Sequence, residues 1–290
     1  MTFVQIEFVA FLAIVFTIYV LFRRFRAQNV VLLLASLVFY GWVHPWFLAL
    51  LLFTATLDYL SGRAMARWPA RKRWFLAASL TGDLGLLGYF KYADFFLENV
   101  RAGLDALGIP SAIGPIGVFL PVGISFYTFQ SLSYIIDVYR GDTQPRRNLL
   151  DYFLFVAFFP QLVAGPILRA DALLVQVERP RRITWEGFAS GLSLALWGAF
   201  KKICVADVVA DYVDKAFQLQ APNAALVAAA TLGFGVQILA DFSGYTDIAR
   251  GVARMMGFEL PLNFDHPYLA KSPSDFWRRW HISFSSWIRD

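Results

Sequence analysis

Charged residues are scarce in this sequence. Asp, Glu, Lys and Arg make up 16% of its 290 residues, whereas hydrophobic residues make up 58%. Soluble domains carry about 25% charged residues, so this chain lacks the polar side chains needed to cover a surface that faces water. Several apolar stretches approach the ~20 residues that cross a bilayer. The composition therefore excludes an ordinary soluble protein and indicates an integral membrane protein embedded in lipid.

Cysteine and clustered metal ligands are also nearly absent. Cys204 is the one cysteine, which excludes an intramolecular disulfide framework. No zinc-ligand set, glycine-rich phosphate loop or Ser-His-Asp order is visible. The net charge of +5 comes from short basic clusters between apolar runs, and such clusters orient membrane proteins. We therefore predict no metal, no bound cofactor and no nucleic-acid partner.

The first apolar run, residues 8–22, has no Lys or Arg before it and Arg23, Arg24 and Arg26 after it. A signal peptide has the opposite order. Because positive residues favour the cytoplasmic side, we expect a first span whose N-terminus lies outside the cytoplasm. The same rule predicts further short spans at residues 30–40, 47–57 and 74–92.

The second half of the chain departs from simple crossings. Residues 94–115 contain Gly and Pro and are expected to form an external amphipathic segment or loop. Basic residues flank both ends of the apolar stretch 152–168, so Pro160 and the Gly165-Pro166 pair favour a re-entrant segment there. The other expected elements are spans at 118–138, 188–209 and 224–242, an amphipathic helix at 244–257, a connector at 263–274 and an aromatic helix at 276–288.

Polar residues inside apolar segments are costly in a bilayer and are therefore functional candidates. The first group lies in residues 121–130, where side chains such as Gln130 either line a wet cavity or form hydrogen bonds between helices. The second group contains Gln161 and Arg169, at the predicted break. This group either forms a structural loop or lines the site of a phosphate-bearing acyl donor, with Arg169 as the anion partner.

The third group of polar residues lies at 241–247. Asp241 and Asp247 are not spaced i, i+4, so they do not face each other on one helix and lack the geometry of an acid–base pair. Ser243 is positioned to cap a helix that starts near Tyr245. Structural roles, including a pairing of Asp247 with a nearby arginine, compete here with a role in a site.

The fourth group is the predicted aromatic helix. Its rings recur at helical spacing and form one stripe: Phe276, Trp277, Trp280, Phe284 and Trp287. His281, one of three histidines, lies beside this stripe. An imidazole accepts a proton near neutral pH, as a general base for a sugar hydroxyl must. Single histidines are also common structural residues, so periodicity leaves both roles open, and His44 and His266 are expected to be structural.

Five stretches together resemble the membrane-bound O-acyltransferase family, especially its bacterial alginate O-acetyltransferase branch. They are residues 121–130, 160–167, 241–248, the Asn263-Phe and Pro267-Tyr pairs, and residues 274–283. They follow one another over almost the whole chain, which makes the resemblance more specific than any one motif. Asp265-His266 stands where the family pattern favours a pair such as Asn-Arg.

The resemblance implies one all-α transmembrane domain over residues 1–290: a ring of tilted helices with re-entrant segments around a central tunnel. It implies that His281 is catalytic. The residues implied to contact the donor or line the tunnel are Tyr127, Gln130, Gln161, Arg169, Asp241, Ser243, Trp277, Arg278 and Trp280. A second histidine is implied on a later helix, so we expect the chain to lack C-terminal helices and part of the catalytic centre.

The resemblance also implies the reaction. Acetyl-CoA is the acyl-donor substrate, the acetyl group crosses the bacterial inner membrane, and a periplasmic SGNH-like acetyltransferase partner places it on an exported polysaccharide such as alginate. Three alternatives stay open: transfer of D-alanine from a carrier-protein thioester to teichoic acid, a translocator of polysaccharide or lipid-linked sugar, and a non-catalytic remnant. A dependence on acetyl-CoA separates an acetyltransferase from a translocator.

Overall fold

The computed structural model describes residues 1–109, 112, 114–163 and 165–290, which form helices and turns without a strand. Part of the loop predicted at 94–115 and one residue of the predicted re-entrant segment lie outside the described residues. The α-helices are α1 (Ile6–Leu21), α2 (Phe25–Gly41), α3 (Phe47–Arg67), α4 (Lys72–Ala106), α5 (Ile124–Arg140), α6 (Leu149–Ala157), α7 (Phe159–Leu162), α8 (Ala170–Val177), α9 (Trp185–Phe200), α10 (Val208–Phe217), α11 (Ala224–Met255), α12 (Pro273–Arg279) and α13 (Ile282–Arg289). A π-helix, Lys201–Asp207, joins α9 to α10.

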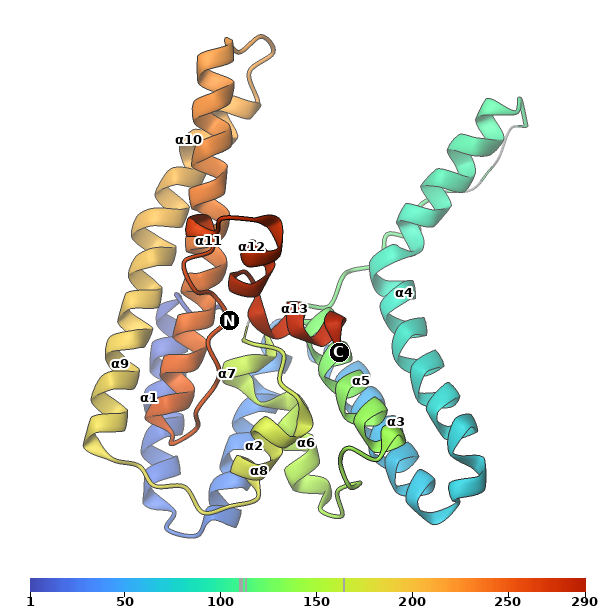
Figure 1. Ribbon diagram of the computed structural model, residues 1–290, viewed down its shortest axis with the longest axis vertical. Coiled ribbons are helices and arrows are strands. Elements are labelled where there is room, and N and C mark those ends of the chain that lie inside the picture. The colour runs from blue at the N-terminus through green and yellow to red at the C-terminus, as the bar shows by residue number, and fades with distance from the viewer. Residues whose placement is uncertain (110–111, 113, 164) are drawn as a thin grey trace.

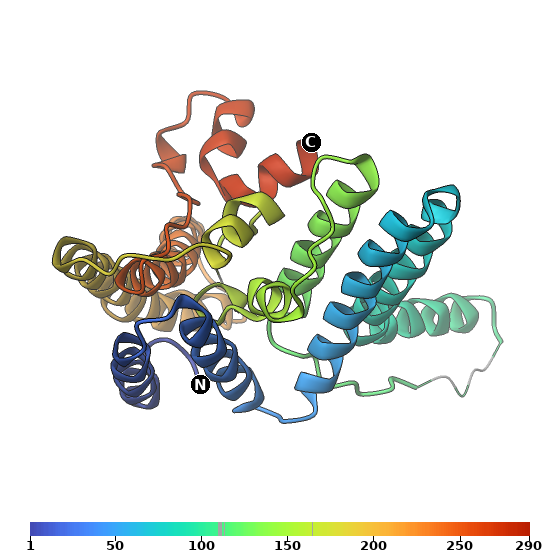
Figure 2. The same cartoon turned by 90° about the horizontal axis from the view of Figure 1, so that it is seen from below.

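Two groups of long helices flank a central segment (Figures 1 and 2). On one side α9 and α10 run antiparallel to α11, and on the other side α3, α4 and α5 pack together. The short helices α6 and α7 lie in the middle, where α6 contacts α2 and α5 and α7 contacts α2 and α11. The C-terminal helices α12 and α13 extend from the α11 side toward α5.

Two helices of the described chain, α3 and α11, are long and apolar enough to cross a bilayer. α1, α2 and the segment Leu149–Leu162 are also apolar but shorter. Large apolar side chains point outward, and Ile6, Leu21 and Leu232 are each 75% exposed. An apolar outer surface of this extent is costly in water and is matched by lipid.

The helix break predicted near Pro160 is present, and the re-entrant path of this segment stays a prediction. α6 ends at Ala157, Phe158 leaves the helical conformation, and Pro160 lies in the first turn of α7. The start of α5 packs directly on this break. Gly123, with φ +77°, precedes α5, and a Cβ added there would lie 2.8 Å from the Leu162 carbonyl oxygen. Only glycine fits this combination of a left-handed backbone and a close backbone contact.

The α9–α11 pair is held at short range by glycines. A Cβ added at Gly198 would lie 2.5 Å from the Gly244 carbonyl oxygen, and one added at Gly191 would lie 2.6 Å from the Gly251 carbonyl oxygen. The two glycines on each helix are seven residues apart, so they lie on one face. Small residues of this kind let helix backbones approach closely in a membrane.

Several predicted boundaries were wrong, among them the end of the span at 47–57, since α3 continues to Arg67. The sequence predicted a span at 224–242 and a separate helix at 244–257, but α11 is one continuous helix. Gly244 is not a helix breaker here, because its missing side chain makes room for the backbone of α9. α4 also continues past the predicted end at residue 92, as far as Ala106, so much of the expected external segment is helical.

Two carboxyl groups are buried between α3 and α4 without a cation. Asp58 and Asp83 are fully buried, and their carboxyls lie within hydrogen-bonding reach of each other. Ser79 donates to Asp58, whereas no N–H or O–H group of the described residues donates to Asp83. Two adjacent carboxylates cannot both be ionised in a low-dielectric interior. We therefore expect the pair to hold one proton between them.

We expect Asp83→Asn to change the free energy of unfolding by less than ~0.5 kcal/mol, because a neutral amide replaces a neutral carboxyl. The matched control is Asp151→Asn. Asp151 is also buried, but it accepts hydrogen bonds from Arg26 at 2.5 Å and Asn29 at 3.0 Å. Loss of these charge-assisted bonds should cost ~2 kcal/mol. Thermal unfolding in detergent measures both, and equal losses would rule out the shared proton.

Candidate active site

The aromatic helix predicted at 276–288 is wrong as a single helix. α12 ends at Arg279 and α13 begins at Ile282, and the chain turns between them. His281 has φ 43° and ψ 54°, in the left-handed region. The spacing of the rings predicted a continuous helix, but backbone hydrogen bonds to residues 263–265 interrupt it.

Four phenylalanines surround the His281 ring. Phe242 from α11 meets it edge to face at 4.7 Å between ring centroids, and Phe284 from α13 stacks on it at 5.2 Å. Phe126 from α5 and Phe264 lie at 6.4 Å. His281 lies in a connector, outside α3 and α11. Burial among these rings lowers its pKa to about 4, so the imidazole is neutral at physiological pH.

Two polar atoms near this turn are buried without a hydrogen-bond partner among the described residues: His281 Nε2 and Asn263 Nδ2. A buried polar group without a partner costs about 1–3 kcal/mol, so each is available to a ligand that supplies one. No group of three or more His, Cys, Asp or Glu residues in the described chain could hold a metal. Asn263 was not predicted as a site residue, and its place in the Asn263-Phe pair is the sequence signal that marks it.

The predicted tunnel residues of α5 and of the segment after α6 are buried; the two glutamines bond to protein, whereas the Tyr127 hydroxyl has no hydrogen-bond partner among the described residues. Gln161 Nε2 donates to Gln130 Oε1, and Gln130 Nε2 donates to the Phe155 carbonyl oxygen at 2.5 Å. The Tyr127 ring meets Tyr40 edge to face at 6.1 Å. In this arrangement the two glutamines connect α5 to the break after α6.

Arg169 lies on the other side of the His281 turn. Its guanidinium donates to Asp290 Oδ2 at 2.5 Å. It also lines a pocket of about 230 Å³ together with Ile167, Ser283 and Trp287. Arg169, the predicted anion partner, therefore lies beside α13.

The aromatic and basic residues of α12 separate into two environments. Trp280 packs on Phe264 at 5.1 Å and on Phe276 at 5.5 Å. Trp277 is 56% exposed and, with Arg278, lines a shallow pocket of about 530 Å³. Trp280 thus belongs to the ring cluster around His281, whereas the other two face outward.

Asp241 and Ser243 face the π-helix that joins α9 to α10. Lys202 pairs with Asp241 at 2.6 Å, and Lys201 pairs with Asp247 at 2.6 Å and donates to Ser243 at 3.0 Å. Arg250 also pairs with Asp247, at 3.2 Å. π-helical segments recur at functional sites. Lys201 and Lys202 were not predicted as site residues, although they interrupt the apolar stretch at 188–209.

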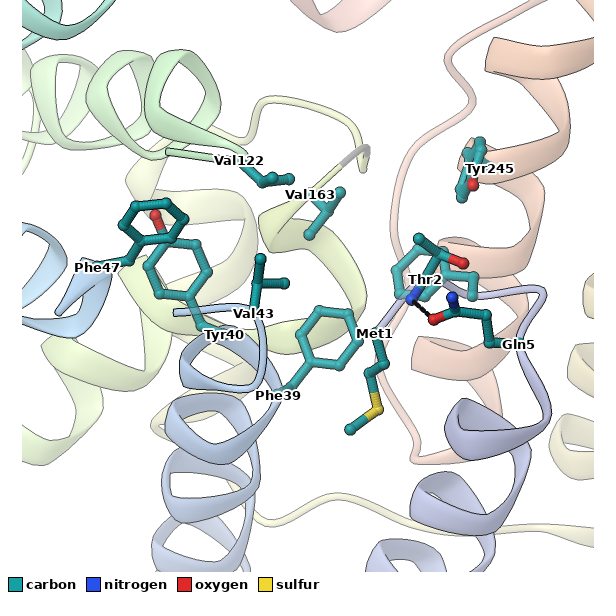
Figure 3. A pocket seen from close by; sticks show the side chains of 11 residues that line it. Met1, Thr2, Gln5, Phe39, Tyr40, Val43, Phe47, Val122, Val163 and Tyr245 are labelled. Carbon is teal, nitrogen blue, oxygen red and sulfur yellow. Dashed lines mark hydrogen bonds between the residues drawn. The ribbon is translucent and has the colours of Figure 1, made fainter. Parts of the chain in front are cut away.

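An apolar cavity of about 400 Å³ lies beside the N-terminus (Figure 3). Its wall comes from α2, from the residue before Gly123, from the re-entrant segment and from α11; the labelled side chains include Phe39, Tyr40, Val122, Val163 and Tyr245. None of the predicted tunnel residues lines it. The tunnel through the molecule stays a prediction.

Long apolar helices, a broken central segment and an enclosed neutral histidine define the class of the protein: an all-α membrane protein with a buried imidazole site. Residues 145–290 match the profile of the membrane-bound O-acyltransferase (MBOAT) family. The chain belongs to this family and is therefore a polytopic membrane protein. This class agrees with the two long and three shorter apolar helices of the described residues.

Three relatives narrow the comparison. The chain is 44% identical over 269 residues to the probable alginate O-acetylase AlgI of Pseudomonas syringae pv. tomato, covering 91% of this chain and 51% of that protein. It is 34% identical to the peptidoglycan O-acetyltransferase of Helicobacter pylori, covering 89% of this chain and 54% of that protein. The teichoic acid D-alanyltransferase of Bacillus subtilis is 30% identical, covering 58% of this chain and 44% of that protein. The chain thus spans about half the length of the curated relatives it matches.

Proposed function

We propose that the protein is a membrane O-acetyltransferase of the bacterial inner membrane. It takes acetyl from acetyl-CoA on the cytoplasmic side and passes it across the membrane for O-acetylation of an exported, alginate-like polysaccharide. The observation that carries this proposal is His281, a neutral imidazole enclosed by four rings, whose Nε2 has no hydrogen-bond partner in the part of the chain that the structure describes.

The chemistry follows from the state of that imidazole. His281 Nε2 accepts the proton of an acceptor hydroxyl while the hydroxyl oxygen attacks the thioester carbonyl of the donor. A carbon–oxygen bond forms, the carbon–sulfur bond breaks, and the proton passes to the departing thiolate of coenzyme A. The surrounding rings exclude water, which would otherwise hydrolyse the thioester.

The remaining assignments belong to the same proposal. Arg23, Arg24 and Arg26 follow α1, which favours a cytoplasmic position for this turn and a periplasmic N-terminus. Residues 1–290 form one transmembrane domain. Arg169 is the anion partner of the donor. A periplasmic SGNH-like acetyltransferase receives the acetyl group and places it on the polysaccharide.

A direct test uses inverted membrane vesicles that contain the protein, with radiolabelled acetyl-CoA outside and the polysaccharide inside. We expect label in the polysaccharide that depends on the protein and is absent with a knockout membrane. Polymer that stays unlabelled, with the periplasmic partner present, would overturn the proposal.

The same vesicles distinguish the alternatives. The 30% identity to a teichoic acid D-alanyltransferase is the observation that favours a second acyl donor. Transfer from a D-alanyl carrier-protein thioester, but not from acetyl-CoA, would support D-alanylation. Movement of polymer or lipid-linked sugar without any acyl donor would support a translocator.

A further inference from the structure

His281 lies between two backbone hydrogen bonds to a single neighbouring segment. The Asp265 amide donates to the Arg279 carbonyl oxygen at 2.9 Å, before His281. The Ile282 amide donates to the Asn263 carbonyl oxygen at 2.9 Å, directly after it. Residues 263–265 therefore hold the chain on both sides of the imidazole.

The side chain of Asn263 adds a second set of bonds. Its Oδ1 accepts from the Ser283 amide at 3.2 Å and from the Ser283 hydroxyl at 2.9 Å. The same hydroxyl accepts from the Ile167 amide at 3.0 Å, at the end of the re-entrant segment. Asn263 is fully buried. One side chain thus joins the connector, the start of α13 and the chain after the central break.

The conformation of His281 requires such support. A left-handed backbone costs a non-glycine residue about 1–2 kcal/mol. Strained residues of this kind persist only where their surroundings fix them, and they gather at functional sites. The aromatic rings around His281 pack on its side chain but make no hydrogen bond to its backbone. The His281 carbonyl oxygen accepts from the Ser285 amide at 2.9 Å, and residues 263–265 hold Arg279 and Ile282 on either side of it.

We propose that Asn263 is the positioning residue of His281: through Ser283 and the adjoining backbone it fixes the imidazole in the ring enclosure. Its effect on rate rests on the proposed function. Misplacing a catalytic group by about 1 Å can reduce a rate ~10²-fold. Loss of the Oδ1 acceptor releases the Ser283 hydroxyl and amide together, so the turn relaxes and the imidazole shifts.

The kinetic test compares Asn263→Ala with Asn148→Ala in the protein purified from its own membrane. Asn148 caps α6, where Oδ1 accepts from the Leu150 amide at 3.0 Å, and has no contact with the His281 turn. We expect Asn263→Ala to lower kcat ~30-fold with little change in KM for acetyl-CoA. Asn148→Ala should lower the thermal midpoint with kcat changed less than twofold. Equal kcat for the two variants would overturn the proposal.

A double variant separates positioning from general loss of structure. With His281→Ala already present, Asn263→Ala should reduce the residual transfer rate less than twofold, because the group that it positions is gone. A further 30-fold loss in that background would show that Asn263 acts independently of His281, and the proposal would be wrong.

A readout without activity keeps this inference apart from the proposed function. Diethyl pyrocarbonate modifies neutral imidazoles that solvent reaches, and mass spectrometry assigns each site. His44 and His266 are exposed and serve as internal references, whereas His281 Nε2 is shielded. Asn263→Ala should speed His281 modification ~10-fold relative to both references. If the unaltered protein transfers no acetyl group, this ratio still decides the inference, and an unchanged ratio refutes it.

Discussion

Replacing His281 with alanine is expected to reduce acetylation of the exported polymer by ~10²- to 10⁴-fold, the usual contribution of a general base. The reason is its state in the fold: the imidazole is enclosed by rings and neutral at physiological pH, and no described residue bonds to its Nε2. Alanine removes the proton acceptor and leaves the ring enclosure in place. The measurement is the initial rate of acetyl transfer in membrane vesicles, supported by the O-acetyl content of the polymer.

The matched controls are His44→Ala and His266→Ala. Both side chains are exposed: His44 packs on Phe119, and His266 pairs with Asp265. We expect each to retain more than half of the activity. Membrane insertion and thermal midpoint of His281→Ala should match the unaltered protein. Acetyl content that stays normal in a properly inserted His281→Ala protein would remove this residue from the mechanism.

Local signals predicted the breaks of the central segment well. Pro160 cannot continue a helix from α6, and the positive residues on both sides of the apolar stretch contradicted a crossing. Both signals depend only on nearby sequence. The short early helices were predicted in the same way, since each ends at a basic cluster or at a turn such as residues 41–45.

Long-range contacts explain where prediction failed. The rings of residues 276–288 recur at helical spacing, yet the helix breaks because residues 263–265 offer its backbone other partners. The spacing of residues along the sequence does not show which distant backbone groups will bond to a helix. The same limit hid Asn263, whose importance comes from Ser283, twenty residues later. His281 could be singled out because its chemistry, rather than its contacts, marks it.

The polar residues of the central segment show a second limit. Gln130 and Gln161 were recognised as costly in a bilayer, but composition could not decide between a wet cavity and a hydrogen bond. The two side chains form a hydrogen bond with each other, although they are 31 residues apart in the chain. The pair joins α5 to the break and leaves Gln161 Oε1 buried without a partner among the described residues. Only the packing of α5 on the break reveals this contact.

The second large effect concerns the pairing of α9 with α11. Gly198→Ala is expected to destabilise the protein by ~3 kcal/mol, the upper range for overpacking a well-packed contact. A Cβ at this position would lie 2.5 Å from the Gly244 carbonyl oxygen and 2.8 Å from the Ile248 amide nitrogen. Both are backbone atoms, so no side chain can turn aside and the helices must separate. α11 carries Phe242, so the enclosure of His281 would loosen as well.

Gly88→Ala on α4 is the matched control, because a Cβ there meets nothing within 4 Å. Alanine is favoured over glycine inside a helix by about 1 kcal/mol, so this variant should be neutral or slightly more stable. The two substitutions are chemically identical, yet we expect them to change the free energy of unfolding in opposite directions. Thermal unfolding in detergent, with size-exclusion chromatography for the folded fraction, measures both. If Gly198→Ala were as stable as Gly88→Ala, the glycine contact would not hold the two helices together, and helix propensity alone would account for both positions.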